Sequence, residues 1–175
     1  MKTKISIVIL GIVLAITLVA CEWWHYGTII EDGIDIRLTD INGNNLLDSA
    51  NPNAFNVDSI QIYRLLPDGN LWLAQNEGTH CPNGFEVSKG EYAKMYLEVS
   101  SDGPDHPELS MTKIDNSTTY IRWNSQDTDT VYATIYHKKG LHCIDEVYYN
   151  GKLMIEGYLK RGSSALVKMH VIKNN

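Results

Sequence analysis

The chain has 175 residues, of which 43% are hydrophobic, 21% are charged and 9% are aromatic, and its formal net charge is −6. This composition excludes a disordered chain, a collagen-like or low-complexity polymer and a protein with several membrane spans. The length argues against more than one sizeable domain, since about 100–200 residues usually make one.

The first twenty residues have the organisation of a secretory signal. Lys2 and Lys4 supply positive charge, and residues 5–20 carry no charge. A basic start, an apolar run and small residues before a cleavage point are typical of a signal peptide. An uncleaved membrane anchor is the alternative, since the apolar run is at the short limit for crossing about 30 Å of hydrocarbon.

The apolar run ends at Leu18-Val19-Ala20-Cys21, which resembles the lipobox of bacterial lipoproteins. In that family the cysteine sulfur receives a diacylglyceryl group, the chain is cut before the cysteine, and the new amine is acylated. The resemblance implies that residues 1–20 are a signal peptide and that acylated Cys21 holds the protein in a bilayer. We expect the bacterial envelope as the location, most simply the outer membrane, on its periplasmic face or at the cell surface.

Cleavage before Cys21 would change the charge balance. It removes two lysines and no acid, which leaves 13 basic and 21 acidic residues and a net charge of −8. An acidic domain repels nucleic acid, so a nucleic-acid partner is not expected.

After residue 21 the chain is organised as a tether, 21–33, followed by a single β-rich domain, 34–175. Short alternating stretches separated by turn residues are typical of strands. They predict strands at 34–38, 60–65, 71–74, 92–99, 118–123, 130–137, 141–149, 152–158 and 165–172. Asn150-Gly151 predicts a hairpin because both positions tolerate positive φ. Asp145 and Glu146 interrupt the alternation of their strand.

This pattern predicts an all-β fold, since no mature segment has an apolar period of 3.6 over about ten residues. About eight or nine short strands are typical of an antiparallel β-sandwich or a barrel. We expect a sandwich, because the loops at 48–58 and 101–110 are too long for a simple up-and-down barrel. A partly open β-barrel is the alternative.

Two cysteines remain after residue 21, namely Cys81 and Cys143. Outside the cytoplasm an even pair predicts a disulfide, and two separate buried thiols are the alternative. Each cysteine follows a histidine, which invites a zinc interpretation. Neighbouring side chains on a strand point to opposite faces, however, so one His-Cys dipeptide does not easily offer two ligands to one ion.

Two further groups contain residue types that can bind a metal. Asp40, Asn42, Asn44 and Asp48 resemble the acidic, asparagine-rich loops that hold calcium, but the spacing departs from the EF-hand pattern, so we favour a turn held by local amide bonds. His137 and His142 would face each other across a tight hairpin, but two imidazoles without a third ligand make a poor site. No metal or other cofactor is expected.

Tyr132 and Tyr136 are the candidate binding residues, since they lie on the face opposite Val131 and Ile135. Exposed aromatic rows can stack on sugar rings or bind a protein. Ordinary cross-strand pairing under a loop is the alternative.

Catalytic motifs are missing from the sequence, which has no Gly-x-Ser-x-Gly, no His-Glu-x-x-His and no phosphate-binding glycine loop. No catalytic residue is assigned and an enzyme is not expected. The expected function is a non-catalytic envelope lipoprotein that binds a protein or glycan. The alternatives are a small lipid-tethered enzyme acting on an envelope polymer or glycan, and an inhibitor or assembly factor.

The lipobox, the Asp40–Asp48 turn and the Tyr149-Asn150-Gly151 hairpin together resemble the small β-rich lipoproteins, without assigned activities, of Gram-negative gut anaerobes. The resemblance to that group implies a cellular location and a fold, and no activity. Three tripeptides also resemble O-glycosylation acceptors of some such bacteria, with turn chemistry as the alternative. They are Asp48-Ser49-Ala50, Asp58-Ser59-Ile60 and Asp129-Thr130-Val131.

Overall fold

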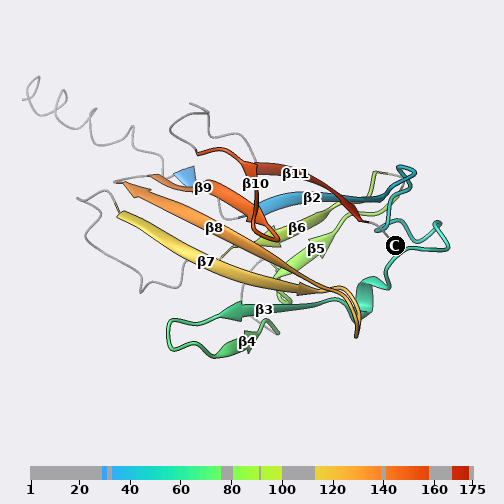
Figure 1. Cartoon of the computed structure of the whole chain (residues 1–175), viewed down its shortest axis with the longest axis horizontal. Helices are drawn as coiled ribbons and strands as arrows, with labels where there is room; N and C mark the ends of the chain where they lie inside the picture. The colour runs from blue at the N-terminus through green and yellow to red at the C-terminus, as the bar shows by residue number, and fades with distance from the viewer. Residues whose placement is uncertain are drawn as a thin grey trace, which may run out of the picture.

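The structure is a computed structural model that describes residues 29–30, 33–75, 81–90, 92–99, 113–138, 141–157 and 167–173. These residues form two β-sheets and a short 3-10 helix, η1 (Val57–Ser59) (Figure 1). In order across the seven-stranded sheet, the strands are β1 (Ile29–Ile30), β9 (Leu141–Tyr149), β8 (Thr128–Lys138), β7 (Lys113–Arg122), β3 (Gln61–Leu65) and β4 (Leu71–Leu73), with β10 (Lys152–Ile155) also paired to β9. The four-stranded sheet has the order β11 (Val167–Lys173), β2 (Gly33–Asp40), β6 (Met95–Glu98) and β5 (Phe85–Val87).

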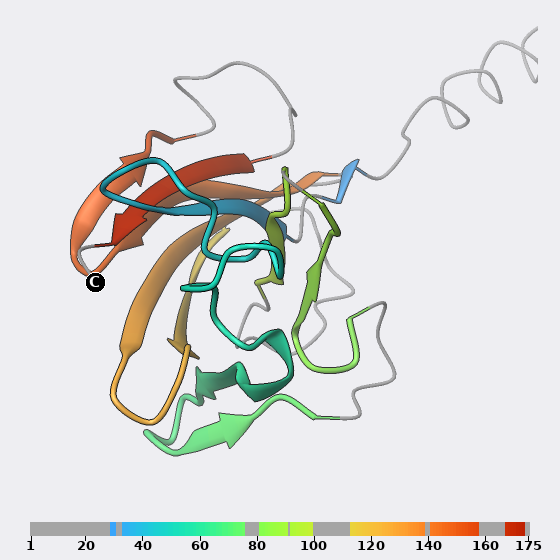
Figure 2. The same ribbon diagram turned by 90° about the vertical axis from the view of Figure 1, so that its right-hand side faces the viewer.

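The two sheets face each other and are not closed into a barrel, which confirms the predicted β-sandwich (Figure 2). Most neighbouring strands are antiparallel. The exceptions are β1 beside β9 and β11 beside β2, which are parallel. Parallel neighbours need a long connection between them, so these pairs join parts of the chain that are far apart in sequence.

Alternating side chains from both sheets fill the space between them. In β2 the side chains of Ile34, Ile36 and Leu38 are fully buried, and in β8 the same is true of Ile135. The alternation predicted at 92–99 is confirmed, since its apolar face is buried in the core. Burial of this kind stabilises a fold by roughly 25 cal/mol for each Å² of apolar surface.

Residues 41–60 cover one end of the core between the sheets (Figure 2). Leu46 is fully buried, and its backbone N–H donates to the carbonyl of Leu38 at 2.9 Å. Phe55 stacks on Trp123 with ring centroids 5.3 Å apart. The loop predicted at 48–58 therefore contributes Phe55 to the packing against the core, and η1 begins at its end.

A buried carboxylate, that of Asp129, joins the two sheets at the same end. Its Oδ2 accepts from Trp123 Nε1 at 2.5 Å and from the hydroxyl of Tyr149, and lies 2.6 Å from Lys173 Nζ. Its Oδ1 accepts from Asn150 Nδ2 at 2.7 Å. Lys173 belongs to β11 in the four-stranded sheet, so this cluster connects the last strand to the β7–β8 hairpin.

The ionisation of Asp129 and Tyr149 follows from these contacts. Burial raises the pKa of Asp129, but the hydrogen bonds from Lys173, Tyr149, Asn150 and Trp123 outweigh burial and hold the pKa below its ordinary value. Burial, followed by the bond to Asp129, raises the pKa of Tyr149. The native state therefore contains an ionised aspartate and a neutral tyrosine.

Two strands were not predicted from the sequence. Ile29–Ile30 forms β1 within the expected tether, and Phe85–Val87 forms β5. The predicted Asn150-Gly151 hairpin is present, with φ values of 49° and 78°. The interruption at Asp145 and Glu146 is a β-bulge, since the register between β8 and β9 shifts at this point.

The predicted disulfide between Cys81 and Cys143 is wrong, because the structure contains both residues as buried thiols. Ile144 pairs with Ile135 on the core side of the sheet, so Cys143, the partner of Tyr136, faces the outer side. Cys81 lies in the turn before β5, where its carbonyl accepts from Gly84 next to Ile62 of β3. In the sheet, β8 and β7 separate β9 from β3.

No helix in the described part of the chain has the length and apolar character needed to span a membrane.

Candidate functional site

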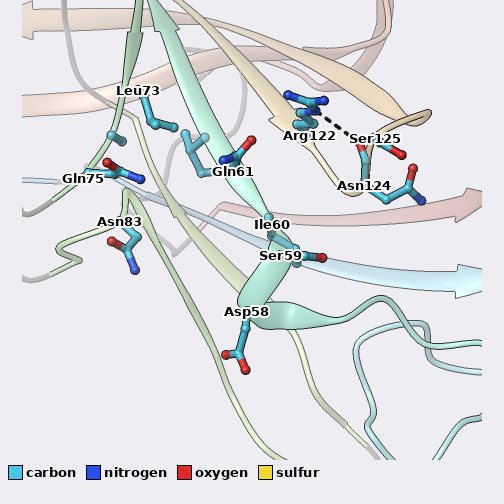
Figure 3. Close-up of a pocket in the computed structure, with 12 residues that line it drawn as sticks. Asp58, Ser59, Ile60, Gln61, Leu73, Gln75, Asn83, Arg122, Asn124 and Ser125 are labelled. Carbon is cyan, nitrogen blue, oxygen red and sulfur yellow. Dashed lines mark hydrogen bonds between the residues drawn. The ribbon is translucent and has the colours of Figure 1, made fainter.

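A cavity of about 480 Å³ lies where the start of β3, the end of β4 and the β7–β8 hairpin meet (Figure 3). This volume is within the range of about 300–1,000 Å³ that is usual for small-molecule sites. Polar side chains with planar or hydroxyl groups make up most of its lining. They are Asp58, Ser59, Gln61, Gln75, Asn83, Arg122, Asn124 and Ser125.

The apolar part of the lining comes from the strands and is continuous with the core. It consists of Ile60, Ile62, Leu73 and Ala74. Ile62 and Ala74 are held together by a backbone bond of 2.9 Å from the Ala74 N–H to the Ile62 carbonyl. One side of the cavity is therefore rigid and apolar, whereas the other sides present hydrogen-bonding groups.

Several polar groups of the cavity are held in place by local bonds. Asn124 Oδ1 accepts from the backbone N–H groups of Gln126 at 2.8 Å and Asp127 at 3.0 Å, which fixes the hairpin. Gln61 Oε1 accepts from the hydroxyl of Tyr63 at 3.0 Å. Both acceptor sites of Asn124 Oδ1 are used, whereas Gln61 Oε1 keeps one. A ligand can therefore use the amide N–H groups of both residues and the remaining acceptor site of Gln61.

The charges of the cavity balance. Asp58 and Arg122 are the charged residues among the described residues that line it. One carboxylate and one guanidinium leave no net charge, so the cavity favours neither an anion nor a cation as a whole.

Next to the cavity, four half-buried tyrosines lie on the outer face of the seven-stranded sheet, and we call them the tyrosine row. They are Tyr63 of β3, Tyr120 of β7, Tyr132 of β8 and Tyr148 of β9. Tyr63 pairs with Tyr120, and Tyr132 pairs with Tyr148 in edge-to-face geometry with ring centroids 5.8 Å apart. The bond between Tyr63 and Gln61 connects the row to the cavity.

The two predicted binding residues, Tyr132 and Tyr136, differ in how far their side chains are buried. Tyr132 is half-buried and belongs to the row, where it makes the cross-strand contact that the sequence offered as the alternative. Tyr136 is only 8% exposed and lies opposite Cys143. Tyr136 therefore does not present its ring to a ligand in the structure.

Asp40 forms a turn of the kind that the sequence favoured over calcium. Its carboxylate accepts from the backbone N–H groups of Asn42 at 2.9 Å and Asn44 at 2.8 Å, and from Asn44 Nδ2 at 2.8 Å. The side-chain bond from Asn44 is the largest cause of a lowered pKa for Asp40. Asp48 Oδ1 accepts from the N–H of Ala50 at 3.0 Å. Each of these two carboxylates therefore accepts hydrogen bonds from residues of its own loop.

His137 and His142 are register partners across β8 and β9, as predicted, and His142 is half-buried. In the ranges that the structure describes, no three His, Cys, Asp or Glu side chains are grouped so as to hold a metal ion. Cys21 and the predicted signal peptide lie outside the described residues.

The cavity lies at the end of the sheet far from β1. The first described residues, Ile29 and Ile30, pair with Leu141 and His142 at the start of β9. The cavity includes the turn at the other end of β8, which is 11 residues long. At about 3.3 Å per residue, roughly 33 Å separate the two ends.

Sequence reasoning missed the residues that line the cavity. They come from four separate stretches of the chain, 58–62, 73–75, 83 and 122–125. The polar members outside the predicted strands have the appearance of ordinary turn residues. One signal was available for the tyrosine row, since the alternation of Ile60, Gln61, Ile62 and Tyr63 puts Gln61 and Tyr63 on one face. Their neighbours on β7 could be found only from the strand register.

Comparisons with protein-family models, with curated proteins and with solved structures find no match to this chain.

Proposed function

We propose that this protein is a non-catalytic binding module of the bacterial envelope, tethered to the outer membrane by acylated Cys21, which binds a protein or glycan partner. The observation that carries the proposal is the open cavity lined by hydrogen-bonding side chains at the end of the sheet far from β1. A lipid tether entering at the β1 end leaves this cavity facing away from the bilayer.

The chemistry of the lining supports binding rather than catalysis. Glycoside hydrolysis usually needs two carboxylates on either side of the scissile bond. Among the described residues around the cavity, Asp58 supplies one carboxylate, and neither a histidine nor a cysteine is present. Amides, hydroxyls and a guanidinium bind and orient a partner without activating a nucleophile.

The tether is tested by labelling cells with radioactive palmitate. We expect the label on the wild-type chain and on a Cys81→Ala control, and its loss in Cys21→Ala together with release of the protein from the membrane fraction. Firm membrane association of unlabelled Cys21→Ala would contradict the lipid anchor and favour an uncleaved anchor instead.

The binding role is tested with the acylated full chain in detergent, mixed separately with purified envelope proteins and envelope polysaccharides. We expect one fraction to be retained, and we expect Asn83→Trp, which fills the cavity at an exposed position, to abolish retention. Asn53→Trp, at an exposed position outside the cavity, is the matched control. Retention that Asn83→Trp leaves unchanged would refute the cavity as the binding site, and turnover of a polysaccharide that stops in Asp58→Asn would establish the enzyme alternative.

A further inference from the structure

The part of the cavity lining that lies on the outer face of the seven-stranded sheet adjoins the tyrosine row. Gln61 pairs with Arg122 across β3 and β7, and two residues further along the same strands Tyr63 pairs with Tyr120. Positions two residues apart on a strand share a face. The four side chains therefore form a two-by-two group in which polar cavity groups lie next to aromatic rings.

The polar groups of this surface match vicinal hydroxyl groups. Gln61, Gln75 and Asn83 each carry a planar amide that offers both an acceptor and two donors, and Asn124 offers its two amide donors. Arg122 adds donors in a planar fork. A sugar presents neighbouring hydroxyls that both donate and accept. Its C–H groups also need an apolar surface, which Ile60 and Leu73 offer in the same cavity.

The charged residues of the lining further limit the chemical class of ligand that the cavity can bind. Recognition of phosphate or carboxylate uses several cationic groups or bidentate arginine pairs. Here the described part of the lining has a single guanidinium, that of Arg122, whose Nε donates to the carbonyl of Asn124, and Asp58 supplies one negative charge at the opposite end of the cavity (Figure 3). An uncharged polyol meets no electrostatic penalty in such a site.

The tyrosine row extends the site beyond a single sugar ring. Its members stand on four successive strands, β3, β7, β8 and β9. Tyr120 and Tyr132 are offset by two residues along β7 and β8. Three interstrand spacings of about 4.8 Å together with this offset give a row of roughly 16 Å. Half-buried tyrosines combine an apolar ring with a polar hydroxyl, which suits an extended ligand with both kinds of surface.

We propose that the site binds a neutral oligosaccharide, with one sugar ring in the cavity and the adjoining rings over the tyrosine row. This inference rests on the proposed binding function and names the ligand class of the same cavity.

The test is calorimetric titration of the acylated full chain in detergent with defined oligosaccharides. The neutral panel contains α- and β-linked glucose, galactose, mannose and xylose oligomers, and the anionic panel contains oligogalacturonates. We expect binding of a neutral oligomer that changes little between 50 mM and 500 mM salt, since no charge pair is involved.

The variants locate the binding site. Gln75→Ala and Asn83→Ala should each weaken binding about 2- to 10-fold, the value of one hydrogen bond, and Tyr120→Ala should weaken longer oligomers more than short ones. Asn53→Ala and Tyr92→Ala are matched controls, because both residues are exposed and lie outside the cavity and the row. Unchanged thermal unfolding of each variant shows that folding is intact.

Three results would overturn the inference, and they bear differently on the proposed function. Salt-sensitive binding of the anionic oligomers that depends on Arg122 would give a different ligand class for a working binding site. An envelope protein retained through the cavity with no glycan bound would leave the binding function in place and refute the sugar. Binding of neither panel and of neither envelope fraction would refute both proposals.

Discussion

Replacing Asp129 with asparagine removes the buried negative charge at the centre of the cluster that joins the two sheets. In the native protein this carboxylate accepts from Trp123, Tyr149 and Asn150 and is paired with Lys173. An asparagine keeps one acceptor oxygen and introduces an NH2 group. In either orientation of the amide, its NH2 group faces some of the groups that donate to Asp129 in the native protein. Lys173 also loses one of its two carboxylate partners, Asp129 and Asp127.

The expected cost follows from how deeply the pair is buried. The side chains of Lys173 and Asp129 are 10% and 7% exposed, and Nζ lies 2.6 Å from Oδ2. Removing one partner of a buried pair costs roughly 3–5 kcal/mol. Asp127, 2.5 Å from the same Nζ, still pairs with Lys173 in the variant. We therefore expect about 3 kcal/mol, a large share of the 5–15 kcal/mol that is typical of a domain.

Urea unfolding of the wild type and of Asp129→Asn measures this cost as a shift of the midpoint at constant slope. The matched control is Asp127→Asn, which removes a contact to the same lysine from a carboxylate that is 32% exposed. Such a pair contributes about 1 kcal/mol or less. Equal midpoints for the two variants would refute the idea that Asp129 is the centre of the cluster.

The pH dependence gives an independent check on Asp129. Its pKa is lowered in the folded protein, so its contribution is fully present above the unfolded pKa of about 3.9. The contribution is lost as pH falls through the lower folded value. The difference in stability between wild type and Asp129→Asn should therefore be constant near neutrality and shrink below about pH 4.

Three further predictions concern other parts of the fold. Gly33→Ala should cost about 1–3 kcal/mol by thermal unfolding, because a Cβ there would overlap the ring of Tyr96, and a cost that persists in a Tyr96→Leu background would contradict this cause. The pKa of Tyr149 is raised in the folded protein, so stability should fall as pH rises above about 10, where the unfolded tyrosine loses its proton, and more steeply than in Tyr149→Phe. Unfolded, unreduced protein should take up an alkylating label at both Cys81 and Cys143, whereas protection of both would restore the disulfide.

The fold was predictable where the signal is local. The Asn150-Gly151 hairpin depends on two residues that accept positive φ, and the bulge at Asp145 and Glu146 is visible as a break in alternation. The strands β1 and β5 have two and three residues, which is too short for alternation to be detected. The pairing of β11 with β2 joins residues about 130 positions apart, and no local pattern encodes it.

The candidate site was less predictable for a related reason. Asn83 and Asn124 each look like a solvated turn residue, and only the assembled sheet brings them to one cavity. The disulfide prediction failed because it used the number of cysteines and the redox compartment, whereas the strand register decides which face each residue occupies. The register puts Cys143 on the outer face of β9.

The position of β11 has a consequence for the order of assembly. Residues 167–173 complete the edge of the four-stranded sheet beside β2, and Lys173 ties that sheet to the β7–β8 hairpin. Residues 167–173 are synthesised after every other strand in the part of the chain that the structure describes. The sheet edge beside β2 and the ion pairs of Lys173 can therefore form only once the other described strands have been made.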